Sequence, residues 1–297
     1  MSLPNFYFGQ STDISSTQGG GVDMDVSFLV SFLRERTGMT VGTDKRGLIE
    51  NRLGPIAARE KLAGVGDLIR LLKADPDHPL CEDVIDAMTT HETFFFRDLE
   101  PFDHLRKVLL PALLNERIQR RTLRIWSAAC STGQEAYSLA MLLEEVFAAN
   151  PSLGPIRSWK IEIVATDIGK RTLRRAKNGV YSRFEVSRGL SEALRARWFQ
   201  PLEHGNWRVR DELKSRVVFK EHNLMESPSE LGVFDLVLCR NLLIYFDLRE
   251  KRQILSGLNS ALAVDGRLML GGAETLFGIT PAFKREAGTT LPVYRKA

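Results

Sequence analysis

Ile125–Ala140, with the sequence IWSAACSTGQEAYSLA, is the stretch that predicts the fold of this chain. Its apolar start suits a buried strand, its small residues suit a tight turn, and a helix is expected from Gln134 onward. A strand that enters a helix through small residues points backbone N–H groups and a helix N-terminus toward a ligand. Glu135 falls in the first helical turn, where its carboxylate can accept hydrogen bonds from the amine or hydroxyl groups of a ligand.

Two later strand ends repeat this arrangement. Ile163–Asp167 (IVATD) and Phe234–Asn241 (FDLVLCRN) each place polar residues directly after an apolar run. Strands and helices alternate around them, which is typical of an α/β fold with a doubly wound, mostly parallel sheet. The carboxyl ends of parallel strands meet at one edge of the sheet, so these polar strand ends predict a nucleotide-type pocket there.

The expected strands are Leu123–Ala128, Ile161–Thr166, Val217–Lys220, Phe234–Cys239 and Arg267–Gly271, and the expected helices are Gln134–Ala149, Lys170–Asn178 and Leu248–Ala263. Near the C-terminus, Phe283–Arg285 and Val293–Arg295 flank turn residues and predict an antiparallel hairpin. The alternation breaks between residues 181 and 216, where the turn signal His204-Gly205-Asn206 predicts an inserted, small β-subdomain.

Residues 23–99 are predicted to form a small all-helical domain. Val26, Leu29, Val30 and Leu33 make one apolar stripe, as on an amphipathic helix. Asp44 is expected to cap a second helix. That helix would turn Leu48, Ile49, Leu53 and Ile56 inward and Lys45, Arg46, Arg52, Arg59 and Lys61 outward. Two more helices are expected near Val65–Lys73 and Cys81–Thr89.

The rest of the chain completes this organisation. Residues 1–22 are polar and rich in Gly, Ser and Thr, without the basic start and apolar block of a signal peptide, and predict a disordered leader. A linker helix is expected within residues 100–120, roughly Glu100–Arg117, and residues 121–297 are expected to form the ligand-binding domain.

Composition narrows the class of protein. Of 297 residues, 43% are hydrophobic and 26% are charged, which is ordinary for a globular protein without a membrane span. A net charge of +4 favours acidic partners but is too weak to demand nucleic acid. Cys81, Cys130 and Cys239 are odd in number and widely spaced, which favours a reducing cytoplasm and no metal site. Cys130 is interpreted as a small apolar residue of the turn rather than a nucleophile.

The first turn also limits the ligand. It lacks the G-x-G-x-x-G and G-x-x-x-x-G-K-[ST] patterns that bind phosphates, so a ligand without phosphates suits it better. S-adenosylmethionine is such a ligand. Asp167 is placed to accept hydrogen bonds from both ribose hydroxyls. The alternative is that Asp167 only caps the following helix.

Two further segments are unusual. In His91–Asp98 (HETFFFRD), three consecutive phenylalanines cannot all face one core, so at least one is expected at a pocket or an inter-domain face. Arg97 can grip a carboxylate or, alternatively, form an inter-domain salt bridge. In Cys239–Asp247 (CRNLLIYFD), a polar Arg-Asn pair ends a buried strand, which is costly without partners. Tyr245 can direct its hydroxyl toward a reacting group or serve only as an aromatic lid.

Taken in order, these motifs resemble the CheR family, the methyltransferases that esterify glutamates on bacterial chemoreceptors. The resemblance covers about residues 25–297 and rests on the segments Thr89–Asp98, Ala129–Glu135, Ala165–Ile168, Asn223–Leu224 and Arg240–Asp247. It departs from the family at His91, where Asn is frequent, and at Gln134-Glu135-Ala136, where Glu-Glu-Pro is common.

The resemblance implies a Rossmann-like methyltransferase sheet, S-adenosylmethionine as cofactor and S-adenosylhomocysteine as product. It implies that Arg97 and Tyr245 flank the transferred methyl group. The cofactor contacts that it implies are His91, Thr93, Arg97, Ala129, Gly133, Glu135, Asp167, Ile168, Asn223, Leu224, Asn241 and Leu242.

The same resemblance implies the substrate. This would be the cytoplasmic helical methylation region of membrane chemoreceptors, with Arg46, Arg52 and Arg59 as docking residues. A cytoplasmic monomer is expected, with no metal, no nucleic-acid partner and no membrane insertion. The alternatives are a methyltransferase acting on another protein or on nucleic acid, and a non-catalytic module that senses S-adenosylmethionine. Intact Arg97, Asp167 and Tyr245 favour catalysis.

Overall fold

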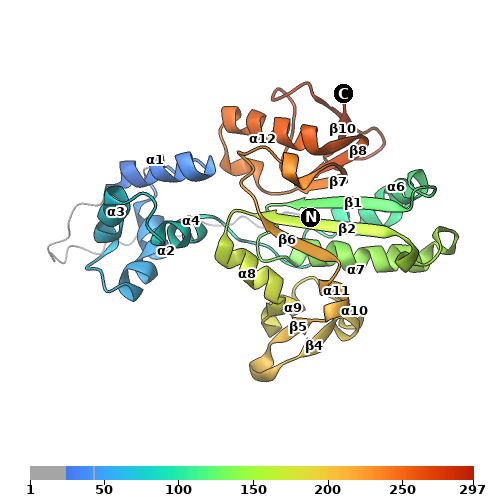
Figure 1. Ribbon diagram of the computed structural model, residues 1–297, viewed down its shortest axis with the longest axis horizontal. Helices are drawn as coiled ribbons and strands as arrows, with labels where there is room; N and C mark the ends of the chain where they lie inside the picture. Colours follow the sequence, from blue (N-terminus) through green and yellow to red (C-terminus); the bar gives the residue numbers. More distant parts are fainter. Residues whose placement is uncertain (1–24, 43) are drawn as a thin grey trace, which may run out of the picture.

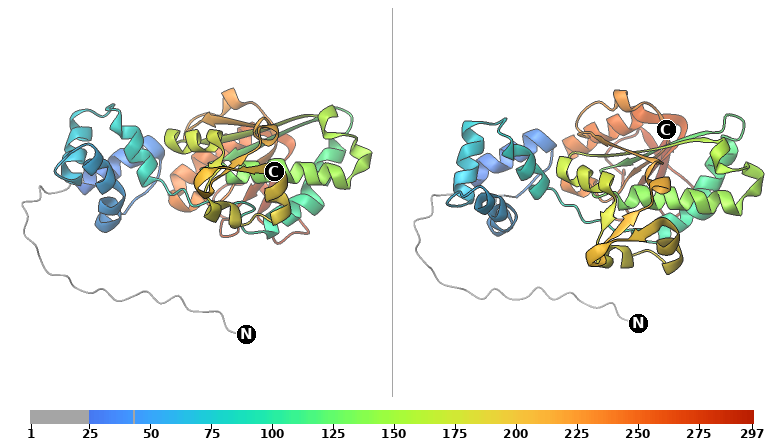
Figure 2. Two further views of the ribbon diagram at one scale, coloured as in Figure 1. Left: turned by 90° about the horizontal axis from the view of Figure 1, so that it is seen from below. Right: turned by 60° about the horizontal axis from the view of Figure 1, so that its bottom comes forward.

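The computed structural model describes residues 25–42 and 44–297, so the predicted leader lies outside the described residues. Helices α1 to α4 lie at one side of the molecule, and a sheet covered by helices lies at the other (Figure 1). One connecting segment after α4 joins the two parts, as both views in Figure 2 show. Within the described residues, no helix is long and apolar enough to cross a membrane.

The N-terminal helices are α1 (Val26–Thr37), α2 (Arg46–Arg59), α3 (Val65–Ala74) and α4 (Leu80–Met88). They pack around one apolar cluster in which Leu29, Leu53 and Leu68 are fully buried. The Asp25 carboxylate accepts the Phe28 N–H at 2.9 Å and caps the start of α1.

Two details of α2 differ from the sequence prediction. Asp44 does not cap the helix, because Lys45 occupies the cap position and the Asp44 carboxylate pairs with its ammonium group at 3.2 Å. Leu48 does not face the core and is 41% exposed. The reason is helical periodicity: Ile49 and Leu53, four residues apart, define the buried face, and Leu48 falls on its flank.

The linker helix contains a change of helical type. It runs as α5 (Glu100–His104), a π-helical turn η1 (Leu105–Leu109) and α6 (Leu110–Glu116) without interruption. Pro111 has no N–H to donate to the preceding turn, and the wide π turn lies directly before it. The predicted single helix is therefore present, with the proline accommodated by a local widening.

The main sheet contains β1 (Thr122–Ala128), β2 (Lys160–Asp167), β6 (Val217–Glu221), β7 (Phe234–Cys239), β8 (Leu262–Leu270), β9 (Phe283–Arg285) and β10 (Val293–Lys296). Their order is β6-β2-β1-β7-β8-β10-β9. The first five are parallel, and β10 pairs antiparallel with both β8 and β9. This order confirms the predicted mostly parallel sheet with an antiparallel C-terminal hairpin.

Helices cover both faces of this sheet, and these helices are α7 (Gln134–Ala149), α8 (Lys170–Asn178) and α12 (Leu248–Ala261). Side chains alternate along β1: Ile125 packs in the cluster of α7 and the linker helix, whereas Trp126 packs in the cluster of α12. Helix α12 ends and β8 begins earlier than predicted. Leu262 pairs with Phe234 but Arg267 pairs with Leu236, so a bulge absorbs the intervening residues.

The insertion after α8 forms a separate three-stranded sheet in the order β3-β5-β4. Its elements are β3 (Val180–Tyr181), α9 (Arg183–Ser187), α10 (Glu192–Trp198), β4 (Phe199–Pro201), β5 (Trp207–Val209) and α11 (Asp211–Lys214). The predicted hairpin around Gly205 is present. Helices α9 and α10 were not predicted, although Ser182 and Glu185 make a capping box and Ser191 caps α10.

Short 3-10 turns complete the structure: η2 (Pro151–Leu153), η3 (Ile156–Ser158), η4 (Glu203–Gly205), η5 (Ser229–Leu231) and η6 (Leu243–Tyr245). The strands β1, β2, β6 and β7 all end at the sheet edge that faces the N-terminal helices (Figure 1). The fold thus brings four strand ends and a second group of helices to one place.

A buried arginine anchors the linker helix at the opposite edge. The Arg117 side chain is 2% exposed, and its Nε donates to Asp235 Oδ1 at 2.8 Å. Its two terminal nitrogens donate to Asp265 at 2.7 and 2.6 Å. Asp235, at the start of β7, also accepts the Arg124 N–H at 2.8 Å. These contacts join the linker helix to β1, β7 and β8.

We predict that Arg117→Ala lowers the free energy of unfolding by about 3 kcal/mol, because it leaves the buried Asp235 carboxylate without its main counter-charge. Arg120→Ala is the matched control, since Arg120 contacts the same oxygen at 2.9 Å from a side chain that is 56% exposed. Its cost should be about 0–1 kcal/mol. Urea denaturation measures both; equal, small costs would show that Arg117 is not an anchor.

Candidate active site

A cavity lies at the carboxyl edge of the sheet, against the end of α1 and the α4–α5 connection. Thr37 and Met39 contribute to its wall. The sequence-predicted residues that line it are His91, Thr93, Arg97, Ala129, Glu135, Asp167, Ile168, Asn223, Leu224, Asn241, Leu242 and Tyr245. Gly133 is the predicted cofactor residue that lies outside this lining.

The turn after β1 is built from residues in the left-handed backbone region. Ala129 and Ser131 have φ values of 57° and 51°, and the Cys130 N–H donates to Thr166 O at 2.8 Å. Gly133 has a φ of 93°, and a Cβ there would lie 3.0 Å from Ala176 Cβ. Gly133 thus shapes the turn from behind, where a larger residue would meet α8.

Glu135 is held by two partners at the start of α7. Ser127 Oγ donates to its Oε1 at 2.8 Å, and Arg240 Nη1 donates to its Oε2 at 3.0 Å. Each carboxylate oxygen has a second lone pair, so both can still accept a hydrogen bond from a ligand. The predicted role for Glu135 remains compatible with these contacts.

Arg240 is a cavity residue that the list of predicted contacts lacked. Its side chain is 2% exposed and also donates to the Arg97 carbonyl and to Asp98, both at 3.0 Å. The signal in the sequence was a cation at the end of a buried strand, which requires a buried partner. Glu135, 105 residues earlier in the sequence, supplies it.

Asp167 bridges two turns. Its Oδ2 accepts the Ser131 N–H at 2.8 Å, and its Oδ1 accepts the Gly169 N–H at 2.9 Å. Burial raises the pKa of Asp167 above its ordinary value, and these two backbone hydrogen bonds oppose the rise. Asp167 does not cap α8, whose N-cap residue is Gly169; it fixes the backbone just before the helix, and its remaining lone pairs stay available at the cavity.

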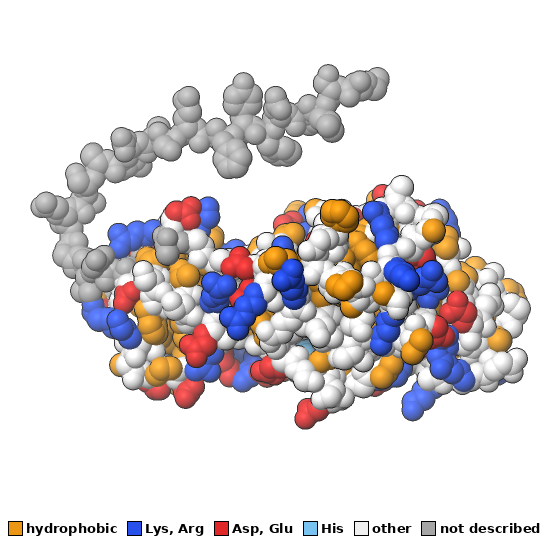
Figure 3. All heavy atoms as spheres, turned by 90° about the horizontal axis from the view of Figure 1, so that it is seen from above, with side chains coloured by type: hydrophobic (Ala, Val, Ile, Leu, Met, Phe, Trp, Pro, Cys, Tyr) orange, Lys and Arg blue, Asp and Glu red, His pale blue; other side chains and the backbone are white. Residues whose placement is uncertain are grey.

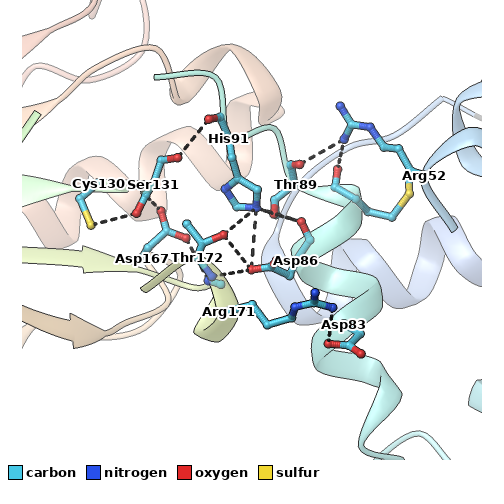
Figure 4. Close-up of polar contacts among 12 residues, drawn as sticks. Arg52, Asp83, Asp86, Thr89, His91, Cys130, Ser131, Asp167, Arg171 and Thr172 are labelled. Carbon is cyan, nitrogen blue, oxygen red and sulfur yellow. Dashed lines mark hydrogen bonds and ion pairs between the residues drawn. The ribbon is translucent and has the colours of Figure 1, made fainter. Parts of the chain in front are cut away.

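His91 faces α4 and α8 with one ring nitrogen (Figure 4). Its Nε2 lies 2.7 Å from Thr89 Oγ1, 2.9 Å from Asp86 O and 3.4 Å from Thr172 Oγ1. The His91 carbonyl accepts the Ser131 hydroxyl at 3.1 Å. His91 thus ties the last turn of α4 to the sheet domain, which gives the departure from the usual Asn a structural role.

The three consecutive phenylalanines do not all face one core. Phe95 and Phe96 are buried in the core of the sheet domain, whereas Phe94 is half-buried. The Phe94 ring lies 5.8 Å from the Arg97 guanidinium and 3.9 Å from that of Arg188, which comes from the insertion. Phe94 thus lies at a contact between two parts of the molecule, as the sequence predicted for at least one ring.

The N-terminal helices complete the cavity wall. Thr40 N–H donates to the Tyr245 carbonyl at 3.1 Å, and the Asn223 amide donates to Arg36 O at 2.9 Å. Arg34 pairs with Asp247 and Glu250, each at 3.1 Å. These bonds hold the end of α1 against the residues around Tyr245.

The predicted docking arginines have different environments. Arg52 Nη1 donates to Met88 O at 2.7 Å and to Thr89 O at 3.2 Å, so it supports the end of α4. Arg59 pairs with Glu60 and Asp83. Arg46, at the start of α2, is exposed. Acidic and basic side chains are interspersed over the face shown in Figure 3, without one uniformly basic surface.

Other chemistries find less support in the described residues. Cys81, Cys130 and Cys239 are free and buried. Burial raises the pKa of Cys130 well above its ordinary value, so its thiol is a poor nucleophile near neutral pH. No group of three His, Cys, Asp or Glu side chains within residues 25–42 and 44–297 is placed to hold a metal ion.

The cavity suits a nucleoside that carries hydroxyl and amine groups. Carboxylates of Glu135 and Asp167 and the amides of Asn223 and Asn241 supply polar partners, and residues such as Leu224 supply apolar wall. This combination fits S-adenosylmethionine, which has a ribose, an amino-acid tail and no phosphate. Arg97 and Tyr245 line the same cavity and can flank a reacting group.

Comparison with known proteins gives two family matches. The model described as "CheR methyltransferase, SAM binding domain" matches residues 91–291. The model described as "CheR methyltransferase, all-alpha domain" matches residues 24–89. Together they span most of the chain.

Individual proteins are similar over a comparable length. The chemotaxis protein methyltransferase Cher2 of Pseudomonas putida is 40% identical over 248 residues, which are 84% of this chain and 89% of that protein. Chemotaxis protein methyltransferase 1 of Pseudomonas aeruginosa is 40% identical over 264 residues, which are 89% of this chain and 94% of that protein. A solved magnesium protoporphyrin IX methyltransferase from Synechocystis, with bound S-adenosylmethionine, is 15% identical, with a TM-score of 0.31 over 68% of this chain and 73% of that one.

Proposed function

Because this chain belongs to the CheR methyltransferase family, we propose that it transfers a methyl group from S-adenosylmethionine to glutamate side chains of chemoreceptors. The products are glutamate methyl esters and S-adenosylhomocysteine, and the proposed role is sensory adaptation in chemotaxis. The observation that carries the proposal is one cavity that combines Glu135 and Asp167, as polar partners for a nucleoside, with Arg97 and Tyr245.

The cofactor would be held by residues from several strand ends. Asp167 would accept hydrogen bonds from the ribose hydroxyls, and Glu135 would accept one from the amine of the amino-acid tail. Asn223 and Asn241 offer amide groups, and Ile168, Leu224 and Leu242 offer apolar wall. S-adenosylmethionine supplies an electrophilic methyl group on a sulfonium when it is bound.

The acceptor needs no strong general base. A glutamate carboxyl has an ordinary pKa near 4.3 and is ionised at neutral pH. The task of the protein is then to align the acceptor oxygen with the methyl group and to exclude water. We assign this alignment to Arg97 and Tyr245, which would orient the acceptor without abstracting a proton.

The contacts of Arg97 support a hydrogen-bonding interaction of only moderate strength with the acceptor carboxylate. Its Nη1 donates to Glu92 O at 2.5 Å, and its guanidinium lies over the Phe94 ring, so the side chain is held in place. Charge is neutralised in the transition state, so a very strong ion pair with the acceptor carboxylate would favour the ground state and slow transfer. Because the Arg97 guanidinium already donates to a carbonyl and lies over a ring, fewer of its N–H groups can donate to the acceptor carboxylate.

We infer that the substrate segment is the cytoplasmic helical methylation region of membrane chemoreceptors. We also propose that the protein acts in the cytoplasm, as a monomer, on an acidic helix. The predicted docking residues are Arg46, which is exposed at the start of α2, Arg52 and Arg59. Arg52 and Arg59 also hold the helical domain together, so their part in docking would be combined with a structural one.

The first prediction concerns the bond that is formed. Receptor-rich membranes incubated with the protein and methyl-labelled S-adenosylmethionine should incorporate label, and mild alkali should release it as methanol, because carboxyl methyl esters hydrolyse readily. Alkali-stable label would indicate N-methylation and overturn the substrate assignment. Binding of S-adenosylhomocysteine without any incorporation would favour a sensing module.

The second prediction concerns the alignment residues. Arg97→Ala and Tyr245→Phe should each lower kcat/KM at least about 10-fold by loosening the alignment of the acceptor. Affinity for S-adenosylhomocysteine should change less than about threefold in Tyr245→Phe, under about 0.7 kcal/mol. Arg174→Ala removes an exposed arginine of α8 outside the cavity and serves as the control. Full activity in both cavity variants would remove them from the mechanism.

The third prediction concerns docking. Arg46→Glu should raise the KM for receptor about threefold at low salt through repulsion from an acidic helix, and the difference should shrink at high salt. Lys284→Glu makes the same charge change on the exposed edge strand β9, away from the cavity, and should leave KM unchanged. Identical KM values and salt dependence in the two variants would place docking elsewhere.

A further inference from the structure

A buried carboxylate lies behind the cavity wall and is not itself one of the residues that line the cavity. Glu274 follows β8 and is 7% exposed. Its Oε2 accepts the N–H groups of Gly271 at 2.7 Å and Asn241 at 2.8 Å. Its Oε1 accepts those of Leu242 at 2.8 Å and Leu243 at 2.7 Å. Four backbone N–H groups therefore converge on one side chain.

The turn that Glu274 binds has an unusual backbone. Asn241 has a φ of 56°, in the left-handed region, two residues after the end of β7. Successive N–H groups in such a turn point to the same side and form a concave anion site. Without an acceptor, these buried N–H groups would lose their hydrogen bonds, and this conformation of the turn would be destabilised.

The turn lies between two residues of the active site. Arg240, just before it, holds Glu135 at 3.0 Å. Just after it, residues 243–245 form η6, and the Tyr245 N–H donates to Leu242 O at 3.1 Å. The backbone atoms that Glu274 binds thus determine where η6 begins and in which direction it presents Tyr245.

We propose that Glu274 is a positioning residue for methyl transfer: its carboxylate fixes the turn of residues 241–243, and through it Tyr245 and the Asn241–Leu242 wall of the cavity. The inference about Tyr245 rests on the proposed function. Both oxygens of Glu274 must accept two hydrogen bonds each. An amide in the same place has only one accepting oxygen and sets an NH₂ group against two N–H donors.

A substitution at Gly271 offers a second, independent way to disturb the contact between Glu274 and the turn. A Cβ at Gly271 would lie 2.7 Å from Asn241 N and 2.8 Å from Glu274 Oε2. Both distances are too short for a carbon atom, so a side chain there would push the turn and the carboxylate apart. Gly271→Ala therefore disturbs the turn while it leaves the charge of Glu274 unchanged.

The test uses Glu274→Gln in the full chain, with unfolding followed separately from kinetics. We expect a cooperatively folded protein whose kcat is at least about 10-fold lower. Affinity for S-adenosylhomocysteine, measured by calorimetry, should fall about threefold or more. Gly271→Ala should also lower both kcat and the affinity for S-adenosylhomocysteine. Glu274→Asp, which keeps the carboxylate, should have a higher kcat than Glu274→Gln. Glu286→Gln, which removes a carboxylate bound to Arg267 at 2.8 Å, is the matched control and should leave both unchanged.

A double-mutant cycle separates positioning from a merely structural role. If Glu274 acts through Tyr245, Glu274→Gln should lower kcat much less in a Tyr245→Phe background than in the wild type. Equal fold-changes in both backgrounds, or an unchanged kcat in folded Glu274→Gln, would overturn the proposal. If Glu274→Gln does not fold, the kcat of Glu274→Asp and of Gly271→Ala is compared in the wild-type and Tyr245→Phe backgrounds instead.

The binding measurement keeps the two proposals distinguishable. If the wild-type protein transfers no methyl group to receptors, the proposed function fails. Weaker binding of S-adenosylhomocysteine to Glu274→Gln than to Glu286→Gln would still support the turn-fixing role of Glu274. Equal affinity of the two variants would overturn that role.

Discussion

The ion pair between Arg240 and Glu135 is the interaction on which the active site depends. It joins the end of β7 to the first turn of α7 across the carboxyl edge of the sheet, at 3.0 Å and with the arginine almost completely buried. The same guanidinium binds Asp98 and the Arg97 carbonyl, so it also fixes the segment that presents Arg97. A charge buried in this way is tolerated only when its partners are in place, which couples three distant segments into one rigid site.

The N-terminal helices are part of this site rather than a separate module beside it. Met39 lines the cavity, Thr40 binds the Tyr245 carbonyl, and Asn223 binds the last turn of α1. The ion pairs of Arg34 with Asp247 and Glu250 hold the same junction from outside. The helical domain that carries the proposed receptor-docking residues thus also contributes the end of α1 to the cavity wall.

The sequence located the cavity residues well and their local partners less well. Strand ends after apolar runs pointed to Glu135, Asp167 and Asn241, and all three line the cavity. Gly133 does not line the cavity; its positive φ and its closeness to α8 give it a part in shaping the turn, and its contact with the cofactor stays a prediction. Glu274 had no motif around it, because three of its four partners are backbone N–H groups 31 to 33 residues away, and such contacts leave no side-chain pattern in the sequence.

The sequence by itself determined the order of strands and helices outside the insertion, the mostly parallel sheet and the edge at which the polar strand ends meet. Hydrophobic periodicity, turn residues and small-residue turns are local properties, because they depend only on residues that are close together in the sequence. Only the tertiary structure decided which polar groups from separate elements meet. Arg240 meets Glu135, His91 meets Asp86 and Thr172, and Arg52 supports the end of α4. These pairings depend on how separate elements pack in space, because a side chain takes its partner from whatever the fold brings within about 3 Å.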